Sequence, residues 1–310
     1  MSLALLFPGQ GSQHVGMGRA LAESEPAAAE VFGTADRVLG FPLSRLMWSG
    51  PEEELTETRN AQPAILAHSA AVLSVIRRRL GPVAFAAGHS LGEFSAHVAA
   101  GTISLEDALA CVRERGELMH RAGTERPGTM AAVLGLADEE VEAVCARVDA
   151  GICVPANFNS SGQVVVSGDL AGVEQGLELA TAAGAKRVVP LSVSGAFHSP
   201  LMEPAAEGLR RRLDSVDLRD PEFPVVSNAT GKPVTTALEG RELLVRQLTS
   251  PVRWRASIDT MRAAGVDRFI EVGPGSVLCG LNRRNAKGAP CASVGEPADL
   301  ERLPDRVVAS

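Results

Sequence analysis

The fold is decided by Val83-Ala-Phe-Ala-Ala-Gly-His-Ser-Leu-Gly-Glu-Phe-Ser-Ala96. A short apolar run, Val83–Ala87, leads into Gly-x-Ser-x-Gly at Gly88–Gly92, and helix-like sequence follows from Glu93 to Ala100. Where this motif joins a strand to a helix, the serine sits on a tight turn that lifts its hydroxyl out of the sheet. The flanking glycines leave room for the neighbouring backbone. We therefore predict that Ser90 is a nucleophile, the alternative being an ordinary glycine-rich turn with a capping serine.

Two further short apolar runs have the length and composition of buried strands. Leu3–Phe7 ends in the breaker-rich loop Pro8–Gln13, and Phe269–Val272 ends at Gly273-Pro274-Gly275. Between the first two strands, Ala61–Leu80 has the pattern of a long helix. Strands that alternate with helices in this way predict an α/β fold.

Residues 128–193 form a unit of a different kind. Four predicted strands and two predicted helices follow one another in the order βαββαβ, which is the ferredoxin-like pattern; they are Thr129–Leu136, Asp138–Val148, Cys153–Asn157, Val164–Ser167, Ala171–Ala183 and Arg187–Val193. Such a run between α/β segments predicts a small domain inserted in a larger one. We expect a large domain of residues 1–126 and 194–310 and a small subdomain of residues 127–193.

A nucleophilic serine needs a base, and the sequence offers six histidines. His198 follows the predicted strand that ends near Val193, which is where a base belongs in α/β hydrolase-like folds. His89 adjoins the serine, so its side chain is expected to point away. The remaining four, His14, His68, His97 and His120, lie in or near helical stretches and are expected to be structural or exposed. No acid stands out as a third partner, although Asp267 and Glu271 are candidates; a backbone carbonyl would serve equally.

The helix that begins after Ser104 carries a charge at the edge of its buried face. Ser104-Leu-Glu-Asp107 is a capping-box pattern, and the helix is expected to run to about His120 with one apolar face. Arg115 lies about 60° from the centre of that face on ideal geometry, whereas Glu114 points the opposite way. A charge on a buried edge has a dedicated partner. Arg115 is therefore a candidate for binding an anion, and the alternative is a structural salt bridge.

The composition excludes several classes of protein. The 310 residues carry a net charge of −7, which does not favour binding to nucleic acid or to an anionic membrane. The five cysteines are widely spaced without C-x-x-C, so we expect neither a metal cluster nor a disulfide framework, and a reducing compartment fits. The sequence predicts no signal peptide and no membrane span, which makes a cytoplasmic location the default. The tail from Glu296 has few pattern signals and is expected to be loosely held.

With these motifs, the chain resembles the malonyl-CoA:acyl carrier protein transacylases, the acyltransferase family of fatty acid and polyketide synthesis. The matching stretches lie in order over residues 3 to about 285. They are Phe7-Pro-Gly-Gln-Gly-Ser-Gln13, Gly88-His-Ser-Leu-Gly-Glu-Phe-Ser-Ala96, Arg115-Gly-Glu-Leu-Met119, Gly128-Thr-Met-Ala-Ala132, Asn157-Phe-Asn-Ser160, Gly195-Ala-Phe-His-Ser199, Gln247-Leu248, Pro251-Val-Arg-Trp254 and Glu271-Val-Gly-Pro-Gly275. The resemblance implies an α/β hydrolase-like large domain with an inserted ferredoxin-like small domain, in agreement with the pattern above.

The resemblance also implies catalytic roles. Ser90 would be the acylated nucleophile and His198 its base. The backbone N–H groups of Gln10 and Leu91 would form the oxyanion hole, and a main-chain carbonyl of Gln247 would orient His198. That carbonyl accounts for the missing acid.

Arg115 would bind the malonyl carboxylate, which a planar, permanently charged guanidinium suits. Phe197 stands where members that take unbranched malonyl carry Phe, and a ring there would crowd an α-methyl branch. Met119 and Asn159 are further candidates for the pocket or for pantetheine binding. The implied substrate is malonyl-CoA, with no permanently bound cofactor, no metal and an acyl carrier protein as acceptor.

Other readings remain open at the level of sequence. A transacylase of a polyketide or other secondary-metabolite pathway would use the same chemistry on another acyl group. A hydrolase that removes acyl chains from carriers would need the elbow but not Arg115, and a non-catalytic carrier-docking module would need neither. Because the chain is acidic, a basic patch must attract the acidic carrier. The candidates are Lys186-Arg187, Arg283-Arg284 and, less favoured, Arg77–Arg79.

Overall fold

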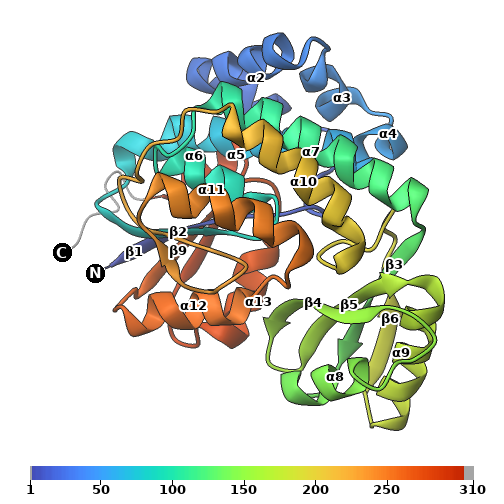
Figure 1. The fold of residues 1–310 in the computed structure, drawn as a ribbon. Coiled ribbons are helices and arrows are strands. Elements are labelled where there is room, and N and C mark those ends of the chain that lie inside the picture. The colour runs from blue at the N-terminus through green and yellow to red at the C-terminus, as the bar shows by residue number, and fades with distance from the viewer. Residues whose placement is uncertain (1, 304–310) are drawn as a thin grey trace.

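The computed structural model describes residues 2–303 as a large α/β domain with a smaller domain attached to one side (Figure 1). The large domain is built on a six-stranded sheet with the order β10-β9-β1-β2-β7-β8, in which only β8 is antiparallel to its neighbour. These strands are β1 (Leu3–Phe7), β2 (Val83–Gly88), β7 (Val225–Val226), β8 (Pro233–Val234), β9 (Arg268–Val272) and β10 (Cys291–Val294).

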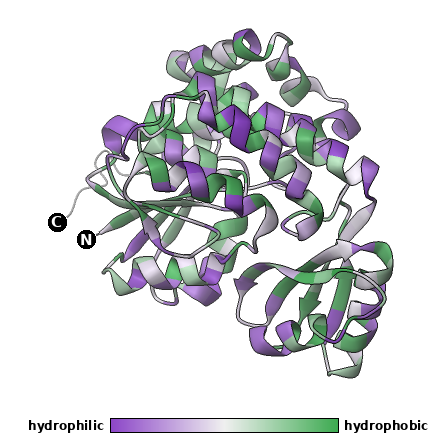
Figure 2. Cartoon of the chain, in the orientation of Figure 1, coloured by the Kyte–Doolittle hydropathy of each residue, from purple (hydrophilic) through white to green (hydrophobic). Residues whose placement is uncertain are grey.

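Helices cover both faces of this sheet, which explains why its central strands are apolar runs and not alternating ones. Every residue of β1 is buried. Leu5 and Phe7 face the core beneath α5 (Thr58–Ile76), whereas Ala4 and Leu6 face the core beneath α12 (Trp254–Ala263). Apolar colour is accordingly concentrated inside the molecule and polar colour on the outer helix faces (Figure 2).

The remaining helices of the large domain complete these two layers. They are α1 (Arg19–Ser24), α2 (Pro26–Leu39), α3 (Leu43–Ser49), α4 (Glu52–Thr56), α6 (Gly92–Ala99), α7 (Leu105–Glu125), α10 (Glu203–Asp214), α11 (Ala237–Arg246), α13 (Val277–Asn285) and α14 (Pro297–Leu300). The long helix predicted for Ala61–Leu80 is α5, which begins three residues earlier and passes into a 3-10 turn at Arg77–Arg79.

The small subdomain has its own four-stranded antiparallel sheet and its own apolar core. Its elements follow in the order β3 (Gly128–Leu134), α8 (Asp138–Cys145), β4 (Cys153–Ser160), β5 (Gln163–Asp169), α9 (Leu170–Ala182) and β6 (Arg187–Pro190). The strand order β4-β5-β3-β6 is that of a ferredoxin-like unit. The predicted fold class, an α/β large domain with an inserted ferredoxin-like small domain, is confirmed.

Two sequence expectations need correction. Cys279 in α13 and Cys291 in β10 form a disulfide, although the wide cysteine spacing had favoured free thiols. The pair meets because β9 and β10 are neighbouring strands with α13 packed beside them, and spacing alone does not reveal that. The tail from Glu296 forms α14 against α1 and β10, so it is held at least to residue 303; residues 304–310 lie outside the described part.

Within the described residues, no helix combines the length and apolar character that a membrane crossing requires.

Candidate active site

Ser90 lies on the turn between β2 and α6, as the Gly-x-Ser-x-Gly pattern predicts. Its φ of 51° falls in the left-handed region, which residues other than glycine rarely adopt. Both flanking glycines are required, because a Cβ at Gly88 would collide with the backbone of Gly92, and a Cβ at Gly92 with the carbonyl of Phe7. The strained turn thus depends on close contact between β1, β2 and the start of α6.

Asn228 fastens this turn from outside the motif. Its Oδ1 accepts the Ser90 backbone N–H at 2.6 Å, and its Nδ2 donates to the Gly88 carbonyl at 2.7 Å. The Asn228 side chain therefore bridges the two backbone groups on either side of His89. Sequence reasoning missed this residue, because it comes from a loop 138 positions later in the chain.

Ser90 and His198 form a dyad. Ser90 Oγ lies 2.8 Å from His198 Nε2, and His198 Nδ1 lies 2.8 Å from the backbone oxygen of Gln247. A carbonyl only accepts, so Nδ1 carries the proton and Nε2 presents its lone pair to the serine. His198 also has a positive φ, 58°. The arrangement needs no acid, and Asp267 and Glu271 serve elsewhere: the first accepts the Ser2 N–H and the second caps the start of α13.

The imidazole is neutral in this environment. Burial and, to a smaller extent, the nearby cation Arg115 together lower the pKa of His198 to about 3, although the hydrogen bond to the Gln247 carbonyl opposes both. A neutral imidazole has the protonation state that a general base requires. The same environment penalises the imidazolium that forms once the base has taken a proton.

Arg115 is fully buried beside Ser90, with an exposed fraction of 1%. Its guanidinium donates to Gln62 Oε1 at 2.6 Å, to Gln247 Oε1 at 2.8 Å and to Ser90 Oγ at 3.2 Å. Among the ion pairs of residues 2–303, none joins Arg115 to a carboxylate, so its partners are neutral amides and a hydroxyl. Burial lowers the pKa of Arg115 to about 10, so it remains a cation at neutral pH.

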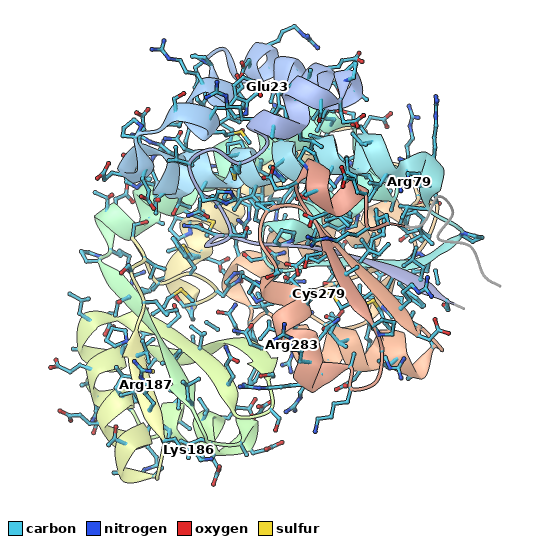
Figure 3. The ribbon with its side chains drawn as sticks, turned by 180° about the vertical axis from the view of Figure 1, so that it is seen from behind. Glu23, Arg79, Lys186, Arg187, Cys279 and Arg283 are labelled. Atoms are coloured by element: carbon cyan, nitrogen blue, oxygen red, sulfur yellow. A yellow bond between two sulfur atoms is a disulfide. The ribbon has the colours of Figure 1, made fainter. Side chains whose placement is uncertain are left out.

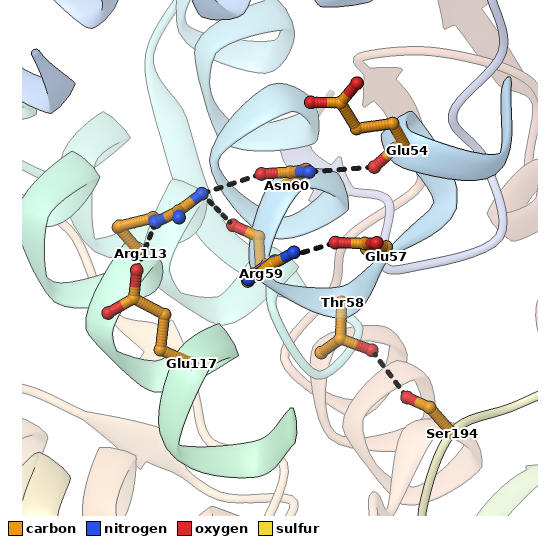
Figure 4. Close-up of polar contacts among 8 residues, drawn as sticks. All are labelled: Glu54, Glu57, Thr58, Arg59, Asn60, Arg113, Glu117 and Ser194. Atoms are coloured by element: carbon orange, nitrogen blue, oxygen red, sulfur yellow. Dashed lines mark hydrogen bonds and ion pairs between the residues drawn. The ribbon is translucent and has the colours of Figure 1, made fainter. Parts of the chain in front are cut away.

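The middle of α7, two residues before Arg115, is hydrogen-bonded to the start of α5 (Figure 4). Two residues before Arg115, Arg113 Nη1 donates to the Arg59 carbonyl at 3.1 Å and to Asn60 Oδ1 at 2.7 Å. At the same end of α5, Thr58 Oγ1 lies 3.3 Å from Ser194 Oγ, on the segment that leads to His198. The start of α5 therefore contacts both the helix that carries Arg115 and the segment that leads to His198.

A cavity of about 370 Å³ opens onto Ser90, Arg115 and His198. Gln10, Leu91, Met119 and Phe197, all predicted from the sequence, lie on its wall. Leu91 is also the residue that precedes the first turn of α6, where backbone N–H groups point outward and attract negative charge.

Asn159, predicted as a pocket residue, is not among the residues that line this cavity. Its Oδ1 is 2.8 Å from His89 Nε2, and its carbonyl accepts from Asn285. Asn157, two residues earlier on β4, lines the cavity instead. Irregular pairing of β4 with β5 on both sides of Asn157 explains the difference, because a bulge re-aims side chains that would otherwise share a face.

In the part of the chain described, no group of three or more His, Cys, Asp or Glu side chains is placed to hold a metal ion.

Comparison with known proteins places this geometry in a family. The model of the acyl transferase domain matches residues 4–300. The chain belongs to this acyl transferase family. It is 47% identical to the malonyl CoA-acyl carrier protein transacylase of Bacillus subtilis over 301 residues, which is 96% of this chain and 95% of the relative. It is 44% identical to the enzyme of the same name from Escherichia coli K12 over 299 residues, 96% of this chain and 97% of the relative.

Solved structures of related proteins superpose closely on this acyl transferase. An acyl carrier protein S-malonyltransferase from Vibrio cholerae gives a TM-score of 0.94 at 42% identity and covers 98% of this chain and 100% of that one. The malonyl-transacylase in a complex with a type II polyketide synthase acyl carrier protein gives the same TM-score and identity, with 98% and 99% covered.

Proposed function

We propose that this acyl transferase moves a malonyl group from malonyl-CoA to Ser90 and then to the phosphopantetheine thiol of an acyl carrier protein. The observation that carries the proposal is Arg115, a buried cation 3.2 Å from the nucleophilic oxygen and without a carboxylate of its own among residues 2–303. A malonyl group supplies that carboxylate at the far end of the acyl chain. The names of the relatives agree with this substrate and this acceptor.

The first half-reaction acylates the serine. His198 Nε2 takes the proton of Ser90 Oγ as the oxygen attacks the thioester carbonyl. The backbone N–H groups of Gln10 and Leu91 stabilise the oxyanion. When the tetrahedral intermediate collapses, the carbon–sulfur bond breaks and the imidazolium returns its proton to the departing coenzyme A thiolate. The acyl-enzyme that results is a malonyl ester of Ser90 with a neutral His198.

The second half-reaction repeats these steps with the carrier thiol. His198 accepts the thiol proton, the sulfur attacks the ester carbonyl, and Ser90 leaves and recovers its proton from the imidazolium. The carboxylate of the acyl group stays on Arg115 throughout, because the guanidinium does not take part in bond making. Arg115 therefore fixes the acyl group while the two thiols exchange.

Phe197 restricts the space beside the dyad. It is 6% exposed, lies on the cavity wall and precedes His198. An α-methyl branch on the acyl group would meet this ring. One methyl group in an apolar pocket changes transfer by about 1–3 kcal/mol, so methylmalonyl is disfavoured and not excluded.

Two exposed basic pairs are suited to docking an acidic carrier. Lys186 and Arg187 project from the small subdomain, and Arg283 projects from α13 (Figure 3). Arg284, next along α13, donates to Gln163 of the small subdomain at 3.4 Å, so this end of α13 adjoins that subdomain. Arg79 lies far from both pairs, at the opposite end of the large domain (Figure 3). We expect the carrier to bind across α13 and the small subdomain.

Three further features belong to the same proposal. The chemistry needs no bound cofactor, because serine and histidine perform both transfers. The location is cytoplasmic, where coenzyme A thioesters are found. The small subdomain comprises residues 127–193, a division that the separate sheet and core support.

Steady-state transfer with malonyl-, methylmalonyl- and acetyl-CoA tests the proposal against its alternatives. We expect malonyl to be transferred fastest to a holo carrier protein, methylmalonyl more slowly and acetyl most slowly. A hydrolase would release free acid at the same rate whether or not the carrier is present. Preference for another acyl group would favour a secondary-metabolite role and would contradict the assignment of malonyl.

A further inference from the structure

Glu93 is a buried carboxylate that the reaction steps above do not use. It is the first acidic residue of α6, it has an exposed fraction of 0%, and it lies three residues after Ser90. Its Oε2 accepts from Gln247 Nε2 at 2.6 Å and from the Asn228 backbone N–H at 3.1 Å. Burying a carboxylate away from water costs free energy unless hydrogen bonds or charges compensate for it, so its contacts indicate what it does.

Gln247 connects this carboxylate to the substrate-binding cation. Its side-chain Nε2 donates to Glu93 and to the Ser90 carbonyl at 2.9 Å, while its Oε1 accepts from Arg115 at 2.8 Å. The two ends of an amide have nearly the same shape, and only their hydrogen-bond partners decide which way the group points. A carboxylate accepts and does not donate, so it selects the orientation in which the oxygen faces Arg115.

The charges in this chain of contacts support the same direction. Burial raises the pKa of Glu93 to about 7, while the hydrogen bonds from Gln247, Asn228 and Ser227 and the charge of Arg115 favour the ionised form and oppose this rise. In turn, the Glu93 charge opposes the lowering of the Arg115 pKa by burial. The two side chains are separated by one amide, and the ionised form of Glu93, which predominates above pH 7, stabilises the Arg115 cation.

We propose that Glu93 is a positioning residue: its carboxylate fixes the Gln247 side-chain amide with its oxygen toward Arg115, and this holds the guanidinium beside Ser90 for the substrate carboxylate. Glu93 itself touches neither the substrate nor the reacting atoms. The inference rests on the proposed role of Arg115 in binding an acid-bearing acyl group.

The test is Glu93→Gln, which keeps the size of the side chain and removes its charge. A charge-assisted hydrogen bond contributes enough that its loss should raise the KM for malonyl-CoA by about tenfold or more in the acylation half-reaction. Acetyl-CoA, which has no carboxylate for Arg115, should change much less, so the malonyl-to-acetyl ratio of kcat/KM falls. Glu93→Asp keeps the charge and should recover part of that ratio.

Glu271→Gln is the matched control. Glu271 is also fully buried, and it accepts the Leu278 and Cys279 N–H groups at 3.0 and 2.8 Å at the start of α13, away from the dyad. Its substitution should lower the free energy of unfolding without changing the malonyl-to-acetyl ratio. A ratio that changed equally in both variants would show a general loss of structure and would overturn the inference.

The direction of the KM change separates positioning from simple electrostatics. If Glu93 acted only as a distant negative charge, its removal would strengthen binding of the malonyl anion and lower KM. An unchanged or lower KM in folded Glu93→Gln therefore overturns the proposal. If Glu93→Gln does not fold, Gln247→Met is used in its place. This variant removes the side-chain amide that Glu93 positions and keeps the backbone carbonyl that accepts from His198. An unchanged malonyl-to-acetyl ratio of kcat/KM in Gln247→Met would likewise contradict the proposal. Malonylation of Ser90 in the wild type, measured separately, tests the proposed function itself.

Discussion

Arg115→Ala is the substitution on which the malonyl assignment depends. The guanidinium is 1% exposed and makes its three hydrogen bonds to neutral groups, so a substrate carboxylate would form a pair with it largely away from water. Losing one partner of such a pair costs about 2–5 kcal/mol. At about 1.36 kcal/mol for each factor of ten, malonyl acylation should fall by about 30-fold to about 5,000-fold in kcat/KM. The cavity is open to solvent, which favours the lower part of this range.

Acetyl acylation should respond differently. Acetyl has no carboxylate to lose, and removal of Arg115 takes away a cation that lowers the His198 pKa. The imidazolium formed during attack becomes easier to form, so the acetyl rate should hold or rise. The malonyl-to-acetyl ratio is therefore expected to fall by at least about 30-fold, the lower bound set by the lost charge pair.

The assay is single-turnover acylation followed by quenched mass spectrometry with both thioesters. Met119→Ala is the control, because Met119 lies one turn further along α7, is 2% exposed and lines the same cavity without a charge. It should change both substrates in the same direction. If Arg115→Ala lowered both substrates equally, Arg115 would be a structural residue and the malonyl assignment would lose its main physical support.

Four further outcomes are expected. Incubation with malonyl-CoA and peptide mass spectrometry should place the adduct on Ser90; an adduct on another residue contradicts the elbow assignment. His198→Ala should slow transfer by about a hundredfold or more, and a near-normal rate would point to another base. Charge reversal at Lys186-Arg187 and Arg283-Arg284 should raise the KM for the carrier protein at saturating malonyl-CoA, whereas charge reversal at Arg77–Arg79 should not. Burial lowers the pKa of His97 to about 4. In the unfolded chain the pKa of this histidine is about 6.5. Between about pH 6.5 and about pH 4 the unfolded chain therefore binds a proton at His97 that the folded chain does not bind. The free energy of unfolding should therefore decrease as the pH falls below 6.5, and His97 should account for about 1 kcal/mol of that decrease at pH 5.5. Urea unfolding of His97→Leu should lack this contribution.

Features that depend on local pattern could be predicted from the sequence. The Ser90 turn follows from glycine spacing between an apolar run and a helix. Helical periodicity places Arg115 at the edge of the buried face, and its exposed fraction is 1%, while Glu114 on the other face lies at the surface near Arg212. The order of strands and helices in the small subdomain also follows from periods of two and 3.6 residues.

Features that depend on tertiary contact could not be predicted. Asn228 reaches Ser90 across 138 positions, and Gln62 reaches Arg115 across 53. No local spacing marks an asparagine or a glutamine as the partner of a distant backbone N–H or guanidinium. Asn159 was predicted for the pocket, but Asn157 lines the cavity instead, because the strand pairing is irregular there and the alternation of residues does not reveal this.

If Arg115 binds the substrate carboxylate as proposed, it also affects the proposed base, His198. In the free site its charge helps to lower the pKa of His198 to about 3, so the imidazole is a weak base and the serine is poorly activated. A malonyl carboxylate that pairs with the guanidinium cancels part of that charge, and the His198 pKa then rises toward the range in which it accepts a proton more readily. An acyl group without a carboxylate leaves the base weak even when it reaches Ser90. In the proposed mechanism, selection of the acid-bearing acyl group would therefore operate in the chemical step as well as in binding. In the proposed acyl-enzyme the carboxylate stays on Arg115, so the same gain would apply when the carrier thiol attacks.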